Sequence, residues 1–93
     1  MSYNISIVGA TGAVGRKLLE TLYKRNFPFS KITLLASKKS EGKKIKFNED
    51  EYEVKNLESY DFKNSDIAFF SAGSEISKIY APLAEKKECY VVD

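Results

Sequence analysis

The sequence predicts an α/β domain in which helices cover both faces of a mainly parallel β-sheet. Residues 4–8 and 67–70 are short and predominantly apolar, which is typical of buried parallel strands. Apolar residues recur at helical spacing in two other segments, one beginning at Ala13 and one near Ile76. A strand, a helix and a second strand in this order form a right-handed crossover in nearly all known proteins.

The first such unit extends over residues 4–36. We expect strands at 4–8 and 32–36. The helix between them begins at Ala13, and its predicted apolar stripe consists of Val14, Leu18, Leu19, Leu22 and Tyr23. Asn26 and Pro28 predict the end of this helix, because asparagine tolerates a left-handed cap and proline does not continue a helix.

The remaining elements complete the predicted sheet. Residues 37–46 form a polar, lysine-rich connection, and the alternation on either side of 48–50 predicts a small hairpin with one solvated face. After the strand at 67–70, helical spacing over 76–84 is interrupted by Pro82, which either kinks the helix or starts a second short one. Residues 90–92 form a last strand. We therefore expect one domain, 1–93, with a Rossmann-like, doubly wound sheet that is incomplete at its C-terminal end.

Composition excludes several classes of protein. The 93 residues carry 15 basic and 13 acidic side chains, and a net charge of +2 favours neither a nucleic-acid partner nor a membrane surface. The chain lacks an apolar segment near the roughly 20 residues of a membrane span, and its N-terminus lacks the pattern of a signal peptide. A single cysteine excludes an internal disulfide framework and is compatible with a reducing cytoplasm. Histidine, the commonest general base, is absent.

A glycine-rich turn follows the first strand directly. Gly9, Gly12 and Gly15 are three residues apart, whereas the usual dinucleotide fingerprint is G-x-G-x-x-G. A purely structural turn remains the alternative, but the position between a buried strand and a helix favours a nucleotide site. In that interpretation Gly9 ends the strand, Gly12 admits the phosphates, and Gly15 allows the helix to approach the sheet.

Two further segments follow predicted strands. An NAD site places an acidic residue after the second strand to bind the ribose 2′-hydroxyl, but this chain has Ala36-Ser37-Lys38-Lys39-Ser40 there. Hydroxyl and ammonium groups attract a 2′-phosphate and so favour NADP, although a solvated lysine loop is the alternative. Ser71, Ala72 and Gly73 follow the strand at 67–70, where small residues permit close approach of a ligand or form an ordinary turn.

Other candidate groups favour structural interpretations. Cys89 is expected to be a buried, inert thiol, since the chain has no histidine to activate it. The carboxylates Glu49, Asp50, Glu51 and Glu53 are expected on the solvated face of the hairpin. No metal-ligand spacing is present. We therefore predict neither a catalytic residue nor a metal site within this chain.

The sequence resembles the N-terminal part of bacterial aspartate-semialdehyde dehydrogenase. The resemblance covers nearly the whole chain in the same order and is carried by residues 8–15, 25–28, 34–37, 40–43, 70–73 and 77–82. Members of this family reduce L-4-aspartyl phosphate with NADPH and yield L-aspartate 4-semialdehyde, NADP and phosphate. That step feeds lysine synthesis through diaminopimelate, and also methionine and threonine synthesis.

The resemblance implies a role for each candidate residue. The cofactor phosphates would be bound by Thr11, Gly12, Ala13 and Val14, next to Gly9. The 2′-phosphate would be bound by Ser37, Lys39 and Ser40, where Lys39 replaces the arginine usual in the family and keeps its charge without its bidentate fork. Ser71, Ala72 and Gly73 would line the ribose–nicotinamide end.

The family's nucleophilic cysteine, general-base histidine and substrate-binding arginines lie beyond the matching segments. We therefore expect this chain to be the cofactor-binding portion of a longer cytoplasmic enzyme, commonly a homodimer, and to bind NADP without catalysing the reaction. One alternative is the related N-acetyl-γ-glutamyl-phosphate reductase, whose turn typically carries an aromatic residue where this chain has Ala13. The other is a non-catalytic Rossmann module that binds NAD(P).

Overall fold

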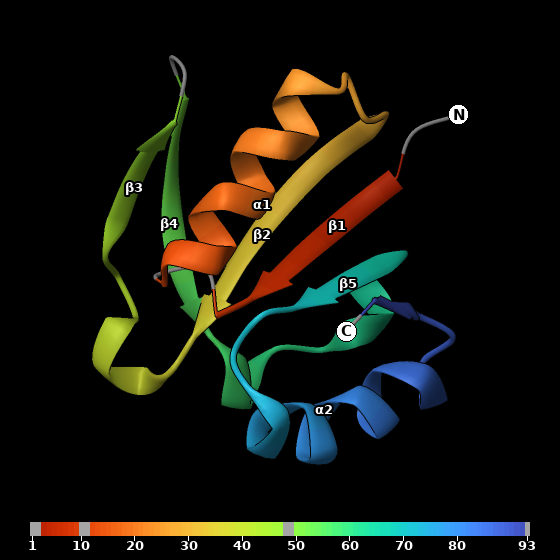
Figure 1. Cartoon of the computed structure of the whole chain (residues 1–93). Coiled ribbons are helices and arrows are strands. Elements are labelled where there is room, and N and C mark those ends of the chain that lie inside the picture. The colour runs from red at the N-terminus through yellow and green to blue at the C-terminus, as the bar shows by residue number, and fades with distance from the viewer. Residues whose placement is uncertain (1–2, 10–11, 48–49, 93) are drawn as a thin grey trace.

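The computed structural model describes residues 3–9, 12–47 and 50–92, which form a six-stranded sheet with helices on both faces (Figure 1). The strands and helices, in chain order, are β1 (Tyr3–Val8), α1 (Ala13–Lys24), β2 (Phe29–Ala36), β3 (Lys44–Phe47), β4 (Asp50–Asn56), β5 (Ile67–Phe70), α2 (Ser74–Lys86) and β6 (Tyr90–Val92). Three short 3₁₀ turns lie between them: η1 (Lys38–Ser40), η2 (Leu57–Ser59) and η3 (Phe62–Asn64).

The order of the strands is that of a doubly wound nucleotide-binding sheet. The sheet runs β3-β4-β2-β1-β5-β6, and every pair is parallel except β3 with β4. If the five parallel strands β1, β2, β4, β5 and β6 are numbered 1 to 5, their order across the sheet is 3-2-1-4-5, which is the Rossmann arrangement. This confirms the predicted fold class. The order reverses at β1, which lies between β2 and β5, and ligands of such sheets bind at the carboxyl ends of the strands near this point.

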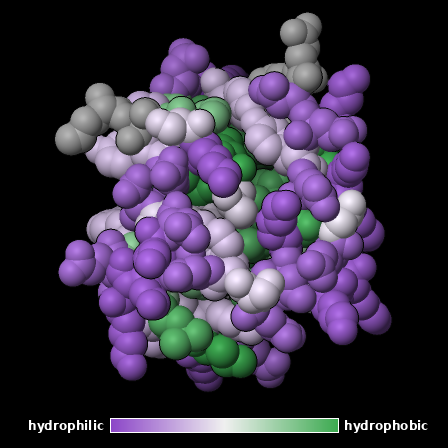
Figure 2. Space-filling model, turned by 180° about the vertical axis from the view of Figure 1, so that it is seen from behind, coloured by the Kyte–Doolittle hydropathy of each residue, from purple (hydrophilic) through white to green (hydrophobic). Residues whose placement is uncertain are grey.

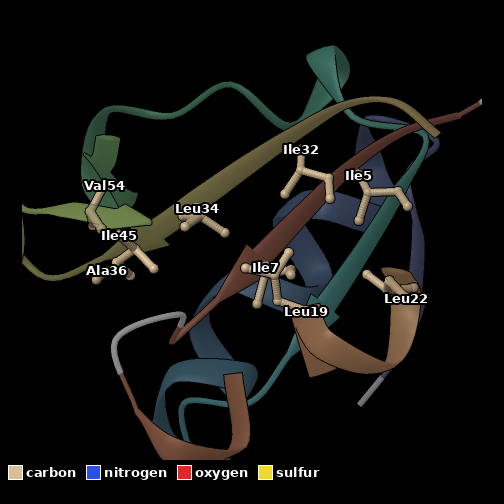
Figure 3. Close-up of a cluster of buried hydrophobic side chains, with 9 residues drawn as sticks. All are labelled: Ile5, Ile7, Leu19, Leu22, Ile32, Leu34, Ala36, Ile45 and Val54. Carbon is tan, nitrogen blue, oxygen red and sulfur yellow. The ribbon is translucent and has the colours of Figure 1, made fainter. Parts of the chain in front are cut away.

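Each face of the central strands packs against its own core. Side chains alternate along a strand, so Ile5 and Ile7 of β1 face α1 while Val8 faces the opposite side. Leu19 and Leu22 of α1 pack against the first face, as the labelled side chains in Figure 3 show. The second core is formed by Val8, Leu35, Leu57, Phe62, Ala68, Phe70, Ala84 and Cys89. Burial on both faces explains why β1 lacks a solvated side after its first two residues.

Helix α1 ends as the sequence predicts. Asn26 has a φ of +53°, its N–H donates to the Tyr23 carbonyl, and the Phe27 N–H donates to the Leu22 carbonyl. This pair of hydrogen bonds is the Schellman arrangement, in which a left-handed residue closes the helix. The predicted apolar stripe was wrong at Val14, which is 66% exposed. The buried side of α1 instead begins at Gly15, one residue and about 100° further around the helix.

Helix α2 is one continuous element that contains Pro82. The sequence left open whether Pro82 kinks the helix or begins another, and the structure gives a single helix of 13 residues. Ile79 and Leu83 of α2 are exposed, and Figure 2 shows hydrophobic residues gathered over this helix on a face that is otherwise largely hydrophilic. No helix formed by the described residues combines the length and the apolar character that crossing a bilayer requires.

The β3–β4 hairpin confirms the predicted alternation and adds a contact that the sequence did not predict. Ile45 and Val54 are buried, whereas Glu51 and Glu53 are exposed. Beyond the hairpin itself, β4 pairs in parallel with β2 and so extends the main sheet. The Tyr23 hydroxyl of α1 hydrogen-bonds to the Tyr52 hydroxyl, which attaches the hairpin to the helix.

Candidate functional site

The loops that follow β1, β2 and β5 meet at the carboxyl edge of the sheet. The Ser71 N–H and the Ser71 hydroxyl both donate to the Val8 carbonyl, at 2.9 and 2.8 Å. The Gly9 N–H donates to the Leu35 carbonyl at 2.8 Å. Two of the three segments predicted from the sequence are thus joined directly, and the end of β2 is bonded to the same loop.

Gly9 is the tightest point of this edge. Its φ is +88°, a conformation that side chains with a Cβ rarely adopt. A Cβ added at Gly9 would lie 2.9 Å from the N, Cα and Cβ atoms of Ala72, well inside van der Waals contact. Glycine is therefore required here twice, once for the backbone conformation and once for the approach of the β5–α2 loop.

The N-terminus of α1 opens onto the same edge. Gly12 is the N-cap, and its N–H donates to the Gly9 carbonyl at 3.1 Å. As a glycine it offers no side chain to cap the helix, the first turn holds no acidic residue, and Ala13 and Val14 are exposed. The N–H groups of a first helical turn lack partners within the helix, so this end favours a negatively charged ligand. Thr11 lies outside the described residues.

Lysines stand exposed where β2 ends. Ser37 is the N-cap of η1, and the Ser40 N–H donates to the Ser37 carbonyl at 2.9 Å. Lys38 and Lys39 are exposed, and neither forms an ion pair within the part of the chain that the structure describes. The segment is anchored to β4, because the Val54 N–H donates to the Lys43 carbonyl at 2.8 Å.

A pocket of about 250 Å³ lies between these loops and α2. Three of the predicted site residues, Gly9, Ser37 and Ala72, line it. Its other lining residues are Val8, Ala36, Leu57, Glu58, Ile76 and Tyr80. Pockets for drug-sized ligands measure about 300–1,000 Å³, so this hollow suits one part of a larger ligand.

The sequence-based site omitted six residues of the pocket, of which Val8 and Ala36 end strands next to predicted site residues. Leu57, Ile76 and Tyr80 were indistinguishable from core positions, and Glu58 from a surface charge. Leu57 directly follows β4, which pairs with β2, but this pairing leaves no local pattern, so the sequence carried no signal for Leu57. Gly12, Ala13, Val14, Lys39, Ser40, Ser71 and Gly73 belong to the same edge without lining this pocket.

A larger hollow, of about 660 Å³, lies along β2 and β4 on the same face as α2. Its lining mixes Lys31, Lys55 and Lys63 with Glu51, Glu53 and Asp66. It contains none of the predicted site residues. Because its charges are of both signs and it is widely open, it has no evident ligand class.

The structure also shows the surroundings of Cys89 and of the hairpin carboxylates. Cys89 is buried at the amino end of β6, opposite the edge that carries the glycine loop. Burial, and secondarily Asp66, raises the pKa of its thiol to about 11. Asp50, Glu51 and Glu53 are exposed, and Glu51 pairs with Lys44 at 3.8 Å. The predicted burial of Cys89 and the predicted exposure of these three carboxylates are confirmed; Glu49 lies outside the described residues.

Comparison with known proteins identifies the family. A family described as semialdehyde dehydrogenase, NAD binding domain, matches residues 4–93. The chain belongs to this family. The description of this family names NAD binding, which agrees with the nucleotide site predicted from the glycine turn and its neighbouring loops.

Two curated relatives with high identity carry the same enzyme name. The domain is 52% identical over 91 residues to aspartate-semialdehyde dehydrogenase from Rickettsia bellii (strain RML369-C), covering 98% of this chain and 27% of the relative. It is 49% identical over 90 residues to the Legionella pneumophila enzyme, covering 97% and 26%. The domain thus spans about a quarter of the length of these relatives. The resemblance found in the sequence is confirmed.

Solved structures share the fold over the whole domain. Aspartate semialdehyde dehydrogenase II from Vibrio cholerae, complexed with ASA, superposes with a TM-score of 0.96 at 45% identity, covering 100% of this chain and 31% of that one. The Candida albicans enzyme with NADP has a TM-score of 0.79 at 21% identity, covering 98% and 29%. The second comparison supports the fold alone.

Proposed function

We propose that this domain binds NADP as the cofactor-binding part of an aspartate-semialdehyde dehydrogenase. One observation carries the proposal: the glycine loop, the lysine segment and the Ser71–Gly73 loop, recognised separately in the sequence, converge at one edge of the sheet. The enzyme name of the curated relatives supports the reaction class.

The residues at this edge fit a dinucleotide. Gly9 and Gly12 leave the backbone uncovered, because neither contributes a side chain between the sheet edge and a ligand. The N–H groups at Ala13 and Val14, in the first turn of α1, would face the pyrophosphate. We also propose that Thr11 contacts the pyrophosphate, because it precedes Gly12 in the same loop.

The lysine segment determines the preference for NADP. The ribose next to the end of β2 would meet Ser37, Lys39 and Ser40, none of which repels a 2′-phosphate. Lys39 is exposed and has no ion-pair partner among the described residues, so its ammonium group is available to the phosphate. The adenine base would enter the adjoining pocket beside Leu57 and Ile76.

Small residues serve the opposite end of the cofactor. Ser71, Ala72 and Gly73 follow β5, which pairs with β1 on the side away from β2, and would line the ribose–nicotinamide end, while Ala72 also lines the pocket proposed for the base. Gly73 has a φ of +98°, and a Cβ there would meet no atom within 4 Å, so this loop leaves open space. The contact between Gly9 and Ala72 keeps this end in register with the phosphate loop.

In the whole protein, bound NADPH would supply the hydride for reducing L-4-aspartyl phosphate to L-aspartate 4-semialdehyde. The domain's own residues bind and orient the cofactor. Catalytic groups and the substrate site would come from the roughly three quarters of the relatives' length that this chain does not span. We further propose a homodimeric, cytoplasmic enzyme, as the resemblance implies; a free, buried Cys89 is compatible with that compartment.

Titration calorimetry with NADPH and NADH tests the proposal. Lys39→Glu should weaken NADPH binding about tenfold to a hundredfold, since hydrogen bonds to charged groups contribute about 1.5–3 kcal/mol, and should leave NADH nearly unchanged. Lys31→Glu is the matched control, because it makes the same charge change at the other end of β2. An unchanged ratio of the two affinities in Lys39→Glu would contradict the assigned role, and failure of the parent domain to bind either cofactor would contradict the function.

A further inference from the structure

Among the described residues, Glu58 is the only charged one that lines the pocket of about 250 Å³. The other lining residues are aliphatic or small, apart from the hydroxyl-bearing Ser37 and Tyr80. A pocket of this kind binds a flat, mostly apolar group, and its few polar groups determine which one. The carboxylate of Glu58 is therefore the strongest polar determinant available to a base in this pocket.

Local hydrogen bonds fix the backbone at Glu58. Its N–H donates to the Asn56 side-chain oxygen at 2.9 Å, which caps η2. The Ser59 hydroxyl donates to the Asn56 carbonyl at 3.3 Å. The preceding residue, Leu57, is 5% exposed and anchors the turn in the core. Glu58 itself is exposed and forms no ion pair among the described residues, so its carboxylate is available to a ligand.

An ionised carboxylate accepts hydrogen bonds and donates none. Adenine carries an amino group at C6, which donates, whereas hypoxanthine and guanine carry an oxygen there, which accepts. We propose that Glu58 selects the base of the cofactor by accepting a hydrogen bond from the 6-amino group of adenine. This inference rests on the proposed function, because it requires the adenosine end of NADP to enter the pocket.

The expected preference is modest because Glu58 is exposed. A hydrogen bond that competes with water changes affinity by about threefold to tenfold. Replacing the amino group with an oxygen removes the donor and sets two acceptors against each other. The N–H at position 1 of hypoxanthine remains a donor, which keeps the effect within this range.

Calorimetry with NADP and its hypoxanthine analogue tests the inference. We expect the parent domain to prefer NADP about threefold to tenfold, and Glu58→Gln and Glu58→Ala to bind the two ligands within twofold of each other. The glutamine amide can accept from adenine or donate to hypoxanthine, so it removes the preference while keeping the size of the side chain. Glu85→Gln, an exposed carboxylate of α2 that does not line this pocket, is the control and should keep the preference.

The outcomes separate the two proposals. If the parent domain binds NADP but shows no preference over the analogue, or if Glu58→Ala keeps the preference, the role of Glu58 is wrong and the proposed function stands. If the parent domain binds neither ligand, the proposed function fails and the inference fails with it.

Discussion

Gly9→Ala introduces a single methyl group at the point where the loops after β1 and β5 touch. Two costs follow from the structure. A residue other than glycine at a φ of +88° is strained by roughly 1–2 kcal/mol. The new Cβ would also lie 2.9 Å from the N, Cα and Cβ atoms of Ala72, and overpacking of this kind costs about 1–3 kcal/mol. We expect the free energy of unfolding to fall by about 2–5 kcal/mol, a large part of the total for a domain of this size.

The chain contains a matched control for the first of these costs. Gly42 has a φ of +87°, and a Cβ there would meet no atom within 4 Å. Gly42→Ala should therefore cost only the conformational strain, roughly 1–2 kcal/mol. Urea unfolding of the parent and both variants, followed by circular dichroism, gives the difference between them, which isolates the contact with Ala72.

A second-site change sharpens this measurement. Ala72→Gly removes one of the three clashing atoms but leaves N and Cα in place, so combining it with Gly9→Ala should recover only part of the contact cost. Gly9→Ala should also weaken NADPH binding, since the phosphate loop and the Ser71–Gly73 loop would move apart. If Gly9→Ala cost no more than Gly42→Ala, the close approach of the two loops would be refuted.

Two further predictions concern the other end of the sheet. Because the pKa of the buried Cys89 thiol is raised to about 11, its contribution to stability is complete below the ordinary value near 9 and is lost as the pH rises through 11. Cys89→Ala should therefore flatten the fall in the free energy of unfolding between these pH values. If urea unfolding at pH 8 and 10.5 gave an equal fall in the parent and in Cys89→Ala, this would be excluded. Glu88 closes α2 at a φ of +62°, so Glu88→Gly should stabilise the domain by about 0.5–1 kcal/mol. The control Glu85→Gly, inside the helix, should destabilise the domain by a similar amount. A thermal melt in which Glu88→Gly lowers the midpoint would contradict the role of Glu88 as the left-handed residue that ends α2.

The sequence predicted the core of the fold because its strands are buried on both faces. Residues 5–8 are all buried, residues 67–70 are buried or half-buried, and this leaves few assignments other than central parallel strands. The start of β2 was missed, since residues 29–31 are mostly exposed and lack an apolar run. The pairing of β4 with β2 was missed as well, because strand partners far apart in the chain leave no local pattern.

The sequence predicted the loops of the candidate site but not the apolar side chains that line its pocket. Glycines and lysines after strands are visible in the sequence, since those residue types are unusual within buried elements. Leu57 and Ile76 carry no such mark, because an apolar side chain that lines a pocket has the same sequence pattern as one that fills a core. Val14 shows the reverse error: helical spacing placed it in the core, whereas its position in the first turn of α1 exposes it beside the phosphate loop.

The most direct test of a single cofactor site spanning three loops is an NMR titration of the isotopically labelled domain with NADPH. The amide signals of Gly12–Val14, Ser37–Ser40 and Ser71–Gly73 should shift together and fit one dissociation constant, while those of Lys31, Glu53 and Lys63 around the larger hollow should not move. Shifts confined to one of the three loops, or centred on the larger hollow, would contradict the account.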